Sequence, residues 1–145
     1  MLFRSAQKVS AAGTALWVGG GIPVSLYVAA SDHWPLRVLG DGAGGAVLTW
    51  YDNGIGTYKV WQQYINGSGQ GQWQNGGIRV STANGPQYYP VACKDGAGGT
   101  IVMWYDQRND LLGDLYAQRI SPTGTLQWPT DGVPVCTSPN EQFQY

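Results

Sequence analysis

The sequence of 145 residues is poor in the residue types that build charged and metal-binding sites. Charged side chains make up 12% of it, about half of the usual share of roughly 25%. Eight Lys and Arg against nine Asp and Glu leave a net charge of −1, which argues against a nucleic acid or an anionic membrane as a partner. Histidine and glutamate occur once each, as His33 and Glu141. A histidine-rich metal site or a hydrolase with paired glutamates is therefore nearly excluded, and no metal or other cofactor is expected.

Long apolar runs and cysteines are also scarce. No run approaches the ~18 residues of a membrane-spanning helix, and residues 1–8 turn polar too early for a secretory signal. Low charge with many Trp, Tyr, Gly, Asn and Gln residues is nevertheless typical of extracellular β proteins, so we expect a piece of a longer secreted or cell-surface protein. In the strand order predicted below, Cys93 and Cys136 lie roughly 14 Å apart, beyond the ~7 Å that a disulfide allows. We predict two free, buried thiols.

The sequence contains a repeat instead. The segment 41–52 returns 54 residues later as 95–106, with eight of twelve positions identical, including Asp-Gly-Ala-Gly-Gly at the start and Trp-Tyr-Asp at the end. A second landmark, a tryptophan about four residues after a turn glycine, occurs three times, at Trp17, Trp73 and Trp128. Such repeats indicate stacked units that share a core.

These landmarks divide the chain into units of unequal length. They predict a half repeat over 2–25, complete repeats over 34–81 and 89–136, and a lead-in to a further repeat over 137–145.

The pattern inside one complete repeat is entirely β. We expect strands over 89–94, 100–105 and 115–120, with a broken fourth over 126–135, and no window shows a helical period. Four antiparallel strands in about 54 residues favour either a β-propeller blade or a linear array of meanders. Both faces of 100–105 are apolar, as a blade between two neighbours requires. We therefore predict an all-β chain, a β-propeller segment of about two and a half four-stranded blades.

The quoted motifs, followed by Asp-Leu-Tyr-Ala-Gln-Arg-Ile at 114–120 and then Gly-Thr-x-x-Trp, resemble a known repeat. It is similar to the tandem β-propeller-type repeats of large secreted and cell-surface bacterial proteins, and the resemblance covers nearly the whole chain. The resemblance implies the fold and an extracellular setting, but no catalytic residues. The first complete repeat departs from it at 59–65, so a role of Asp114 or Arg119 is not shared by every unit.

The glycine runs and the aspartates are explained by turns. A phosphate loop would need a helix after the glycines, whereas strands are predicted on both sides of 95–99. The aspartates stand one per turn rather than grouped as in a calcium loop, and each can bond the amides of its own turn. In the densest cluster of aspartates, an Asp106–Arg108 or an Asp114–Arg119 ion pair is the simplest explanation of the charged residues.

The aromatic side chains are the best candidates for binding. The recurring ones, Trp17, Trp50, Trp73, Trp104 and Trp128, are expected to wedge between neighbouring units. Exposed aromatic rings beside Asn, Gln and Asp side chains can stack on sugar rings and bond their hydroxyl groups, although simple packing explains non-recurring aromatics as well. The candidate ligand-binding residues are Asp32, His33, Trp34, Trp61, Gln87, Tyr88, Tyr89 and Tyr116.

The expected function is that of a non-catalytic binding or scaffolding module of an extracellular repeat protein, with a glycan as the expected ligand. A purely structural repeat is the alternative. A glycoside hydrolase-like propeller is a distant third, because carboxylates and arginines are not gathered as such an active site needs. A propeller closes with about four to eight blades, and residues 2–9 would present an unpaired strand edge. We therefore expect self-association or a place in a larger ring.

Overall fold

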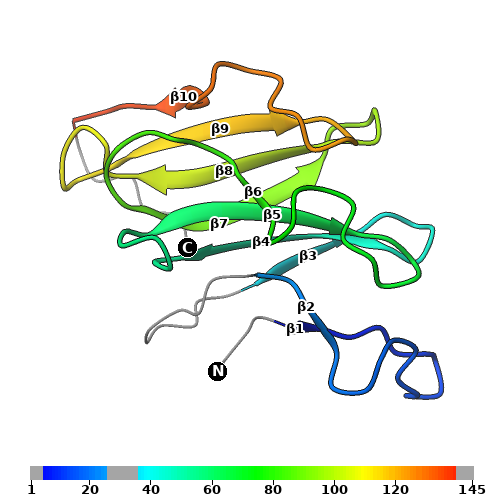
Figure 1. The fold of residues 1–145 in the computed structure, drawn as a ribbon. Coiled ribbons are helices and arrows are strands. Elements are labelled where there is room, and N and C mark those ends of the chain that lie inside the picture. Colours follow the sequence, from blue (N-terminus) through cyan, green and yellow to red (C-terminus); the bar gives the residue numbers. More distant parts are fainter. Residues whose placement is uncertain (1–4, 26–35, 140–145) are drawn as a thin grey trace.

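The computed structural model describes residues 5–25 and 36–139, and every regular element in them is a β-strand (Figure 1). Three antiparallel sheets follow one another along the chain. The first sheet has two strands, β1 (Ser5–Ala6) and β2 (Ile22–Pro23). The second, called the middle sheet, has the order β3 (Arg37–Gly40), β4 (Ala46–Asp52), β5 (Lys59–Ile65) and β6 (Ile78–Arg79). The third sheet has the order β10 (Val133–Cys136), β9 (Asp114–Ile120), β8 (Thr100–Asp106) and β7 (Gln87–Lys94).

The prediction of an all-β chain built from antiparallel sheets is confirmed. The middle sheet lies inside the predicted repeat 34–81, and the third sheet starts slightly before the predicted 89–136, at Gln87. The broken fourth strand is shorter than expected, because Leu126 forms only an isolated bridge with Ile120. The described residues form neither a closed barrel nor a closed propeller, so the propeller assignment stays a prediction.

Aspartate and glycine close the hairpin in front of each long central strand. Asp41 Oδ1 accepts hydrogen bonds from the amides of Ala43 and Gly45 at 2.6 and 2.9 Å, and Asp95 repeats this pattern in the third sheet. Glycine is required at position 45, because a Cβ there would lie 2.5 Å from the carbonyl oxygen of Ile65. The predicted turn role of these two aspartates is confirmed.

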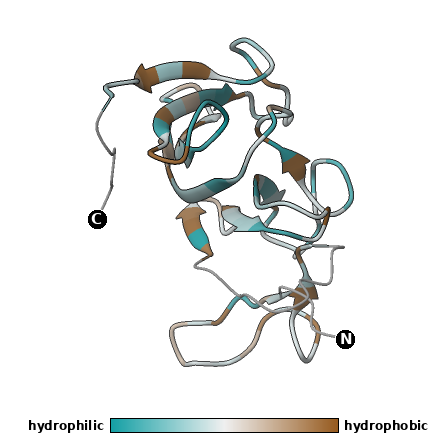
Figure 2. Ribbon diagram, turned by 90° about the vertical axis from the view of Figure 1, so that its left-hand side faces the viewer, coloured by the Kyte–Doolittle hydropathy of each residue, from teal (hydrophilic) through white to brown (hydrophobic). Residues whose placement is uncertain are grey.

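Two hydrophobic cores lie between the sheets rather than within any one of them. Figure 2 shows the sheets one above another, with brown apolar segments on their strands. The first core joins the two-stranded sheet to the middle sheet and buries Trp50 completely. The second joins the middle sheet to the third and buries Trp104 completely. The middle sheet is therefore covered on both faces, which explains why β4 is apolar on both sides.

A tryptophan from each of the first two units covers a turn of the following sheet. The indole Nε1–H of Trp17 donates a hydrogen bond to the carbonyl oxygen of Gly67 at 3.2 Å, and that of Trp73 donates to Pro122 at 2.9 Å. The ring of Trp73 lies against Gly124, where a Cβ would come 2.7 Å from the indole. The prediction that these tryptophans wedge between neighbouring units is confirmed.

The two cysteines form no disulfide with each other, as predicted, but they are not buried. Cys93 in β7 is exposed and Cys136 in β10 is half-buried. They lie on the two edge strands of the third sheet, opposite Ile101 and Leu115, on the face that no described sheet covers. The prediction of buried thiols is wrong, because burial there requires a further sheet on that face.

Candidate functional sites between the sheets

The interface between the middle and third sheets has two chemically different ends. β4 and β8, with seven residues each, run the length of this interface. Both strands begin after an Asp-Gly-Ala-Gly-Gly turn and end in Trp-Tyr-Asp. A cluster of tyrosines lies at the Trp-Tyr-Asp end, and a pocket lies at the glycine-turn end.

The tyrosine cluster brings together five rings from both sheets. The ring centroid of Tyr51 lies 5.9 Å from Tyr58, 5.6 Å from Tyr88 and 5.8 Å from Tyr89, each in an edge-on arrangement. Tyr105 closes the group, 6.5 Å from Tyr89. Edge-on aromatic pairs are stabilising, so the cluster holds this end of the interface together. Tyr89 is its one exposed member, with 43% of its surface open.

A β-bulge turns Tyr89 outward. The register shifts between Tyr88 and Val91, where β7 contains one residue more than the facing part of β8. Tyr89 has φ of +50°, and it is the one non-glycine residue with positive φ among those described. Such a backbone costs on the order of 1–3 kcal/mol and persists only where its surroundings enforce it. Bulges of this kind often re-aim a side chain beside a functional site.

Two of the predicted binding residues, Tyr88 and Tyr89, belong to this cluster, but the others do not. Gln87 is fully buried, and its side-chain amide donates to Asp106 at 3.1 Å. Trp61 is buried in the first core. Both side chains are used in packing between strands and offer no open face to a ligand. Three further candidates lie outside the described residues: Asp32, His33 and Trp34.

Tyr116, the remaining candidate, is buried beneath an ion pair. Its ring stacks on Trp104, and the guanidinium carbon of Arg108 lies 3.6 Å from its centroid. Arg108 Nη2 lies 2.7 Å from Asp106 Oδ2, which confirms one of the two predicted pairs. Burial alone would lower the pKa of Arg108, but the hydrogen bond and charge of Asp106 outweigh it and raise that pKa. Tyr116 is thus a packing element of the interface.

Two charged side chains, one of them buried, also stabilise the connection between the two sheets. Lys59 donates through Nζ to the carbonyl oxygens of Ala83 and Gly85, and burial lowers its pKa. Asp131 accepts hydrogen bonds from the amide and the hydroxyl of Thr82, both at 2.8 Å. Burial alone would raise the pKa of Asp131, but these bonds outweigh it and lower that pKa. Both charged groups are engaged in hydrogen bonds that stabilise the fold.

Two other types of site are not found in the part of the chain that the structure describes. Across residues 5–25 and 36–139, no three Asp, Glu, His or Cys side chains gather as a metal ion would need. This part of the chain also contains no helix that is long and apolar enough to cross a membrane.

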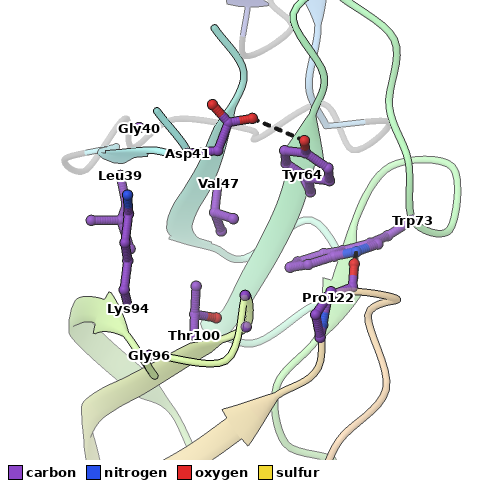
Figure 3. A pocket seen from close by; sticks show the side chains of 12 residues that line it. Leu39, Gly40, Asp41, Val47, Tyr64, Trp73, Lys94, Gly96, Thr100 and Pro122 are labelled. Atoms are coloured by element: carbon purple, nitrogen blue, oxygen red, sulfur yellow. Dashed lines mark hydrogen bonds between the residues drawn. The ribbon is translucent and has the colours of Figure 1, made fainter. Parts of the chain in front are cut away.

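The pocket at the glycine-turn end has a volume of about 340 Å³. In Figure 3 the indole of Trp73 stands on the right, between Tyr64 and Pro122, while Lys94 stands on the opposite side and Asp41 lies at the top. The pocket is lined from both sheets by Leu39, Gly40, Asp41, Val47, Tyr64 and Trp73, and by Lys94, Gly96, Gly98, Gly99, Thr100 and Pro122.

Asp41 and Tyr64 form the polar wall of this pocket. The Tyr64 hydroxyl donates a hydrogen bond to Asp41 Oδ2 at 2.9 Å, and this bond raises the pKa of Tyr64. Burial alone would raise the pKa of Asp41, but hydrogen bonds from its turn amides and from Tyr64 outweigh it and lower that pKa. Asp41 is therefore ionised at neutral pH, and it forms no ion pair within the described residues.

The equivalent position in the third sheet carries different chemistry. Arg119 stands where the middle sheet has Tyr64, and its Nε lies 2.8 Å from Asp95 Oδ2. The predicted pairing of Arg119 with Asp114 is wrong, because residues five apart on one strand point to opposite faces. Sequence reasoning missed the pocket, although the exchange of Tyr64 for Arg119 beside an unchanged aspartate was visible in the repeat.

No protein-family model, no curated protein and no solved structure matches this sequence significantly. The resemblance to secreted propeller-type repeats is neither supported nor contradicted by these comparisons.

Proposed function

We propose that this chain is a non-catalytic scaffolding and binding module of an extracellular repeat protein, whose sheets stack like propeller blades. The observation that carries the proposal is the repetition of one packing arrangement at both junctions between its sheets. Each junction has an apolar face, a buried tryptophan and a second tryptophan on the following turn. The resemblance to repeats of secreted and cell-surface proteins supports the extracellular setting.

The third sheet leaves open the face that the middle sheet buries. Val80 is fully buried against the third sheet, whereas the equivalent Val135 is 53% exposed. Ile101 and Leu115 on the same face are half-buried. We call Ile101, Leu115 and Val135 the trailing face. Covering a large apolar side chain is worth about 1.5–3 kcal/mol, so this face favours contact with another unit.

A second copy of this chain offers the matching surface. Ile65 and Ile120 are buried against the preceding sheet, whereas the equivalent Val9 is 61% exposed. We call the surface around Val9, whose equivalents a preceding sheet covers at both internal junctions, the leading surface. The trailing face of one copy against the leading surface of the next would repeat the junction inside the chain, as a head-to-tail contact.

Light scattering during size exclusion tests this stacking. We expect a mass above 15.6 kDa that increases with protein concentration. Val135→Glu places a charge on the trailing face and should shift the protein toward the monomer, whereas the control Ile55→Glu in the β4–β5 turn should not. A sharply melting monomer at every concentration, or equal masses for Val135→Glu and the unmodified chain, would overturn the stacking proposal.

Carbohydrate binding is the second part of the proposal, and the exposed ring of Tyr89 in its bulge favours it. An open aromatic face can stack on a sugar ring. In a glycan array followed by fluorescence titration, Tyr89→Ala should abolish binding and Tyr89→Phe should retain it. If no glycan binds, the purely structural alternative is favoured. Hydrolysis of any substrate in a broad glycosidase screen would contradict the non-catalytic assignment.

A further inference from the structure

We infer that the pocket between the middle and third sheets binds the ring of one uncharged monosaccharide. This inference rests on the carbohydrate part of the proposed function, but it places the ligand at the opposite end of the interface from Tyr89. The pocket volume of about 340 Å³ is near the lower end of the roughly 300–1,000 Å³ range of ligand sites. A single sugar ring fits this size better than an oligosaccharide.

The apolar wall of the pocket is a fixed aromatic ring. Trp73 donates its indole N–H to Pro122 and packs against Gly124, and its ring centroid lies 6.3 Å from that of Tyr64. Figure 3 shows the indole of Trp73 held between Tyr64 and Pro122, with the edge of the ring directed toward the pocket. Because the ring is held in place before any ligand binds, apolar contact of a sugar with it costs little further ordering.

The polar walls carry opposite charges on opposite sides. Asp41 is ionised and can accept hydrogen bonds, whereas Lys94 is exposed and can donate them from the opposite side of the pocket. A sugar hydroxyl both donates and accepts, and hydrogen bonds to charged groups are the stronger kind. An uncharged polyhydroxyl ring satisfies both walls at once, whereas a ligand with a net charge would be repelled by one of them.

Comparison along the repeat shows how the charge beside this position differs between the junctions. In the third sheet Arg119 neutralises Asp95 from within the protein. At the first junction Lys8 stands at the position of Tyr64, and a Cβ on Gly44 would lie 2.5 Å from its Nζ. Among the described units, the middle sheet alone places an uncharged side chain here. The charge of Asp41 is therefore left for a ligand.

The direct test is a titration of the isotope-labelled chain followed by NMR. Glucose, galactose, mannose and N-acetylglucosamine would be added up to about 50 mM, above the roughly millimolar Kd expected for a small ligand with few contacts. At least one sugar should shift the indole N–H of Trp73 and the amides of Gly96 and Gly98. The absence of any shift in the pocket, or shifts with the zwitterion L-serine instead of sugars, would overturn the inference.

Two variants separate the pocket from the rest of the molecule. Tyr64→Arg should pair with Asp41 as Arg119 pairs with Asp95, so the chain folds but sugar binding is lost. Lys94→Ala should increase Kd roughly tenfold, whereas the control Arg37→Ala, which removes an exposed charge that does not line the pocket, should leave Kd unchanged.

The outcomes distinguish this inference from the proposed function. Sugar-induced shifts confined to Tyr88 and Tyr89, and unaffected by Tyr64→Arg, would overturn the pocket site while leaving carbohydrate binding in place. Shifts in the pocket that Tyr64→Arg removes and Tyr89→Ala does not would support it, whether or not the chain self-associates.

Discussion

The contact between Trp73 and Gly124 provides a quantitative test of how the sheets are joined. A Cβ at Gly124 would lie 2.7 Å from the indole, and φ at this glycine is +81°. Gly96 has almost the same φ, +80°, but nothing lies within 4 Å of a Cβ built there. Both Gly→Ala substitutions strain the backbone equally, whereas Gly124→Ala alone also disturbs the junction between sheets.

This difference determines how much stability each variant is expected to lose. For Gly96→Ala we expect a loss of about 1–2 kcal/mol in the free energy of unfolding, the cost of a left-handed backbone for a residue with a Cβ. Gly124→Ala adds the cost of overpacking, typically about 1–3 kcal/mol, so its total loss should be about 2–5 kcal/mol. The indole of Trp73 cannot move away cheaply, because its N–H is bonded to Pro122.

Urea unfolding monitored by circular dichroism measures both losses by linear extrapolation. All variants are compared at one protein concentration, because self-association contributes to apparent stability. In a Trp73→Ala background the excess cost of Gly124→Ala over Gly96→Ala should disappear, since the two mutated residues are in contact. Equal losses for the two glycine variants, or an excess that persists without Trp73, would refute the reasoning.

Three further predictions concern charge and thiol chemistry. Arg108→Ala leaves the buried carboxylate of Asp106 without its ion-pair partner and should cost about 3–5 kcal/mol in urea unfolding; a loss below about 0.5 kcal/mol, the usual surface value, would contradict the pairing. Although burial opposes it, hydrogen bonding keeps the pKa of Asp131 below its ordinary value of 3.8. The ionised carboxylate of Asp131 therefore stabilises the folded state fully above that ordinary value, and this stabilisation is lost as pH falls through the lower pKa of the folded state. Asp131→Asn should accordingly destabilise the chain at about pH 6 but change its stability little at about pH 2. Cys93, being exposed, should react with a thiol reagent faster than half-buried Cys136, and equal rates measured by mass spectrometry would argue against the open arrangement of this sheet.

The strands and turns were predictable because their causes are local. Asp41 bonds the amides of its own turn, and the apolar run of β4 needs no distant partner to be read as a strand. Recurrence of the same segment 54 residues later then indicated how many sheets to expect. The position of Trp73 between units was predictable from the repeat. A tryptophan that recurs at the same place in each unit, outside the strands of its own sheet, indicates a contact between neighbouring units.

The candidate site was predictable only in part, because exposure depends on what packs from elsewhere in the chain. Gln87 and Tyr89 are two residues apart in β7, yet Gln87 is fully buried and Tyr89 is exposed, because Tyr89 lies in a bulge. No sequence signal placed that bulge. Arg119 likewise pairs with Asp95 instead of Asp114, because Asp95 lies on the same face of the sheet as Arg119 and Asp114 does not.

Composition and repetition thus specified the all-β architecture, the hairpin turns and the tryptophans at the junctions, since each depends on neighbours in the sequence or on the period of the repeat. Packing between the sheets was needed to bury Tyr116 beneath Arg108, expose Tyr89 and form the pocket beside Tyr64. Those features arise where two sheets pack together, and the order of residues along one strand does not show which distant residues will contact it.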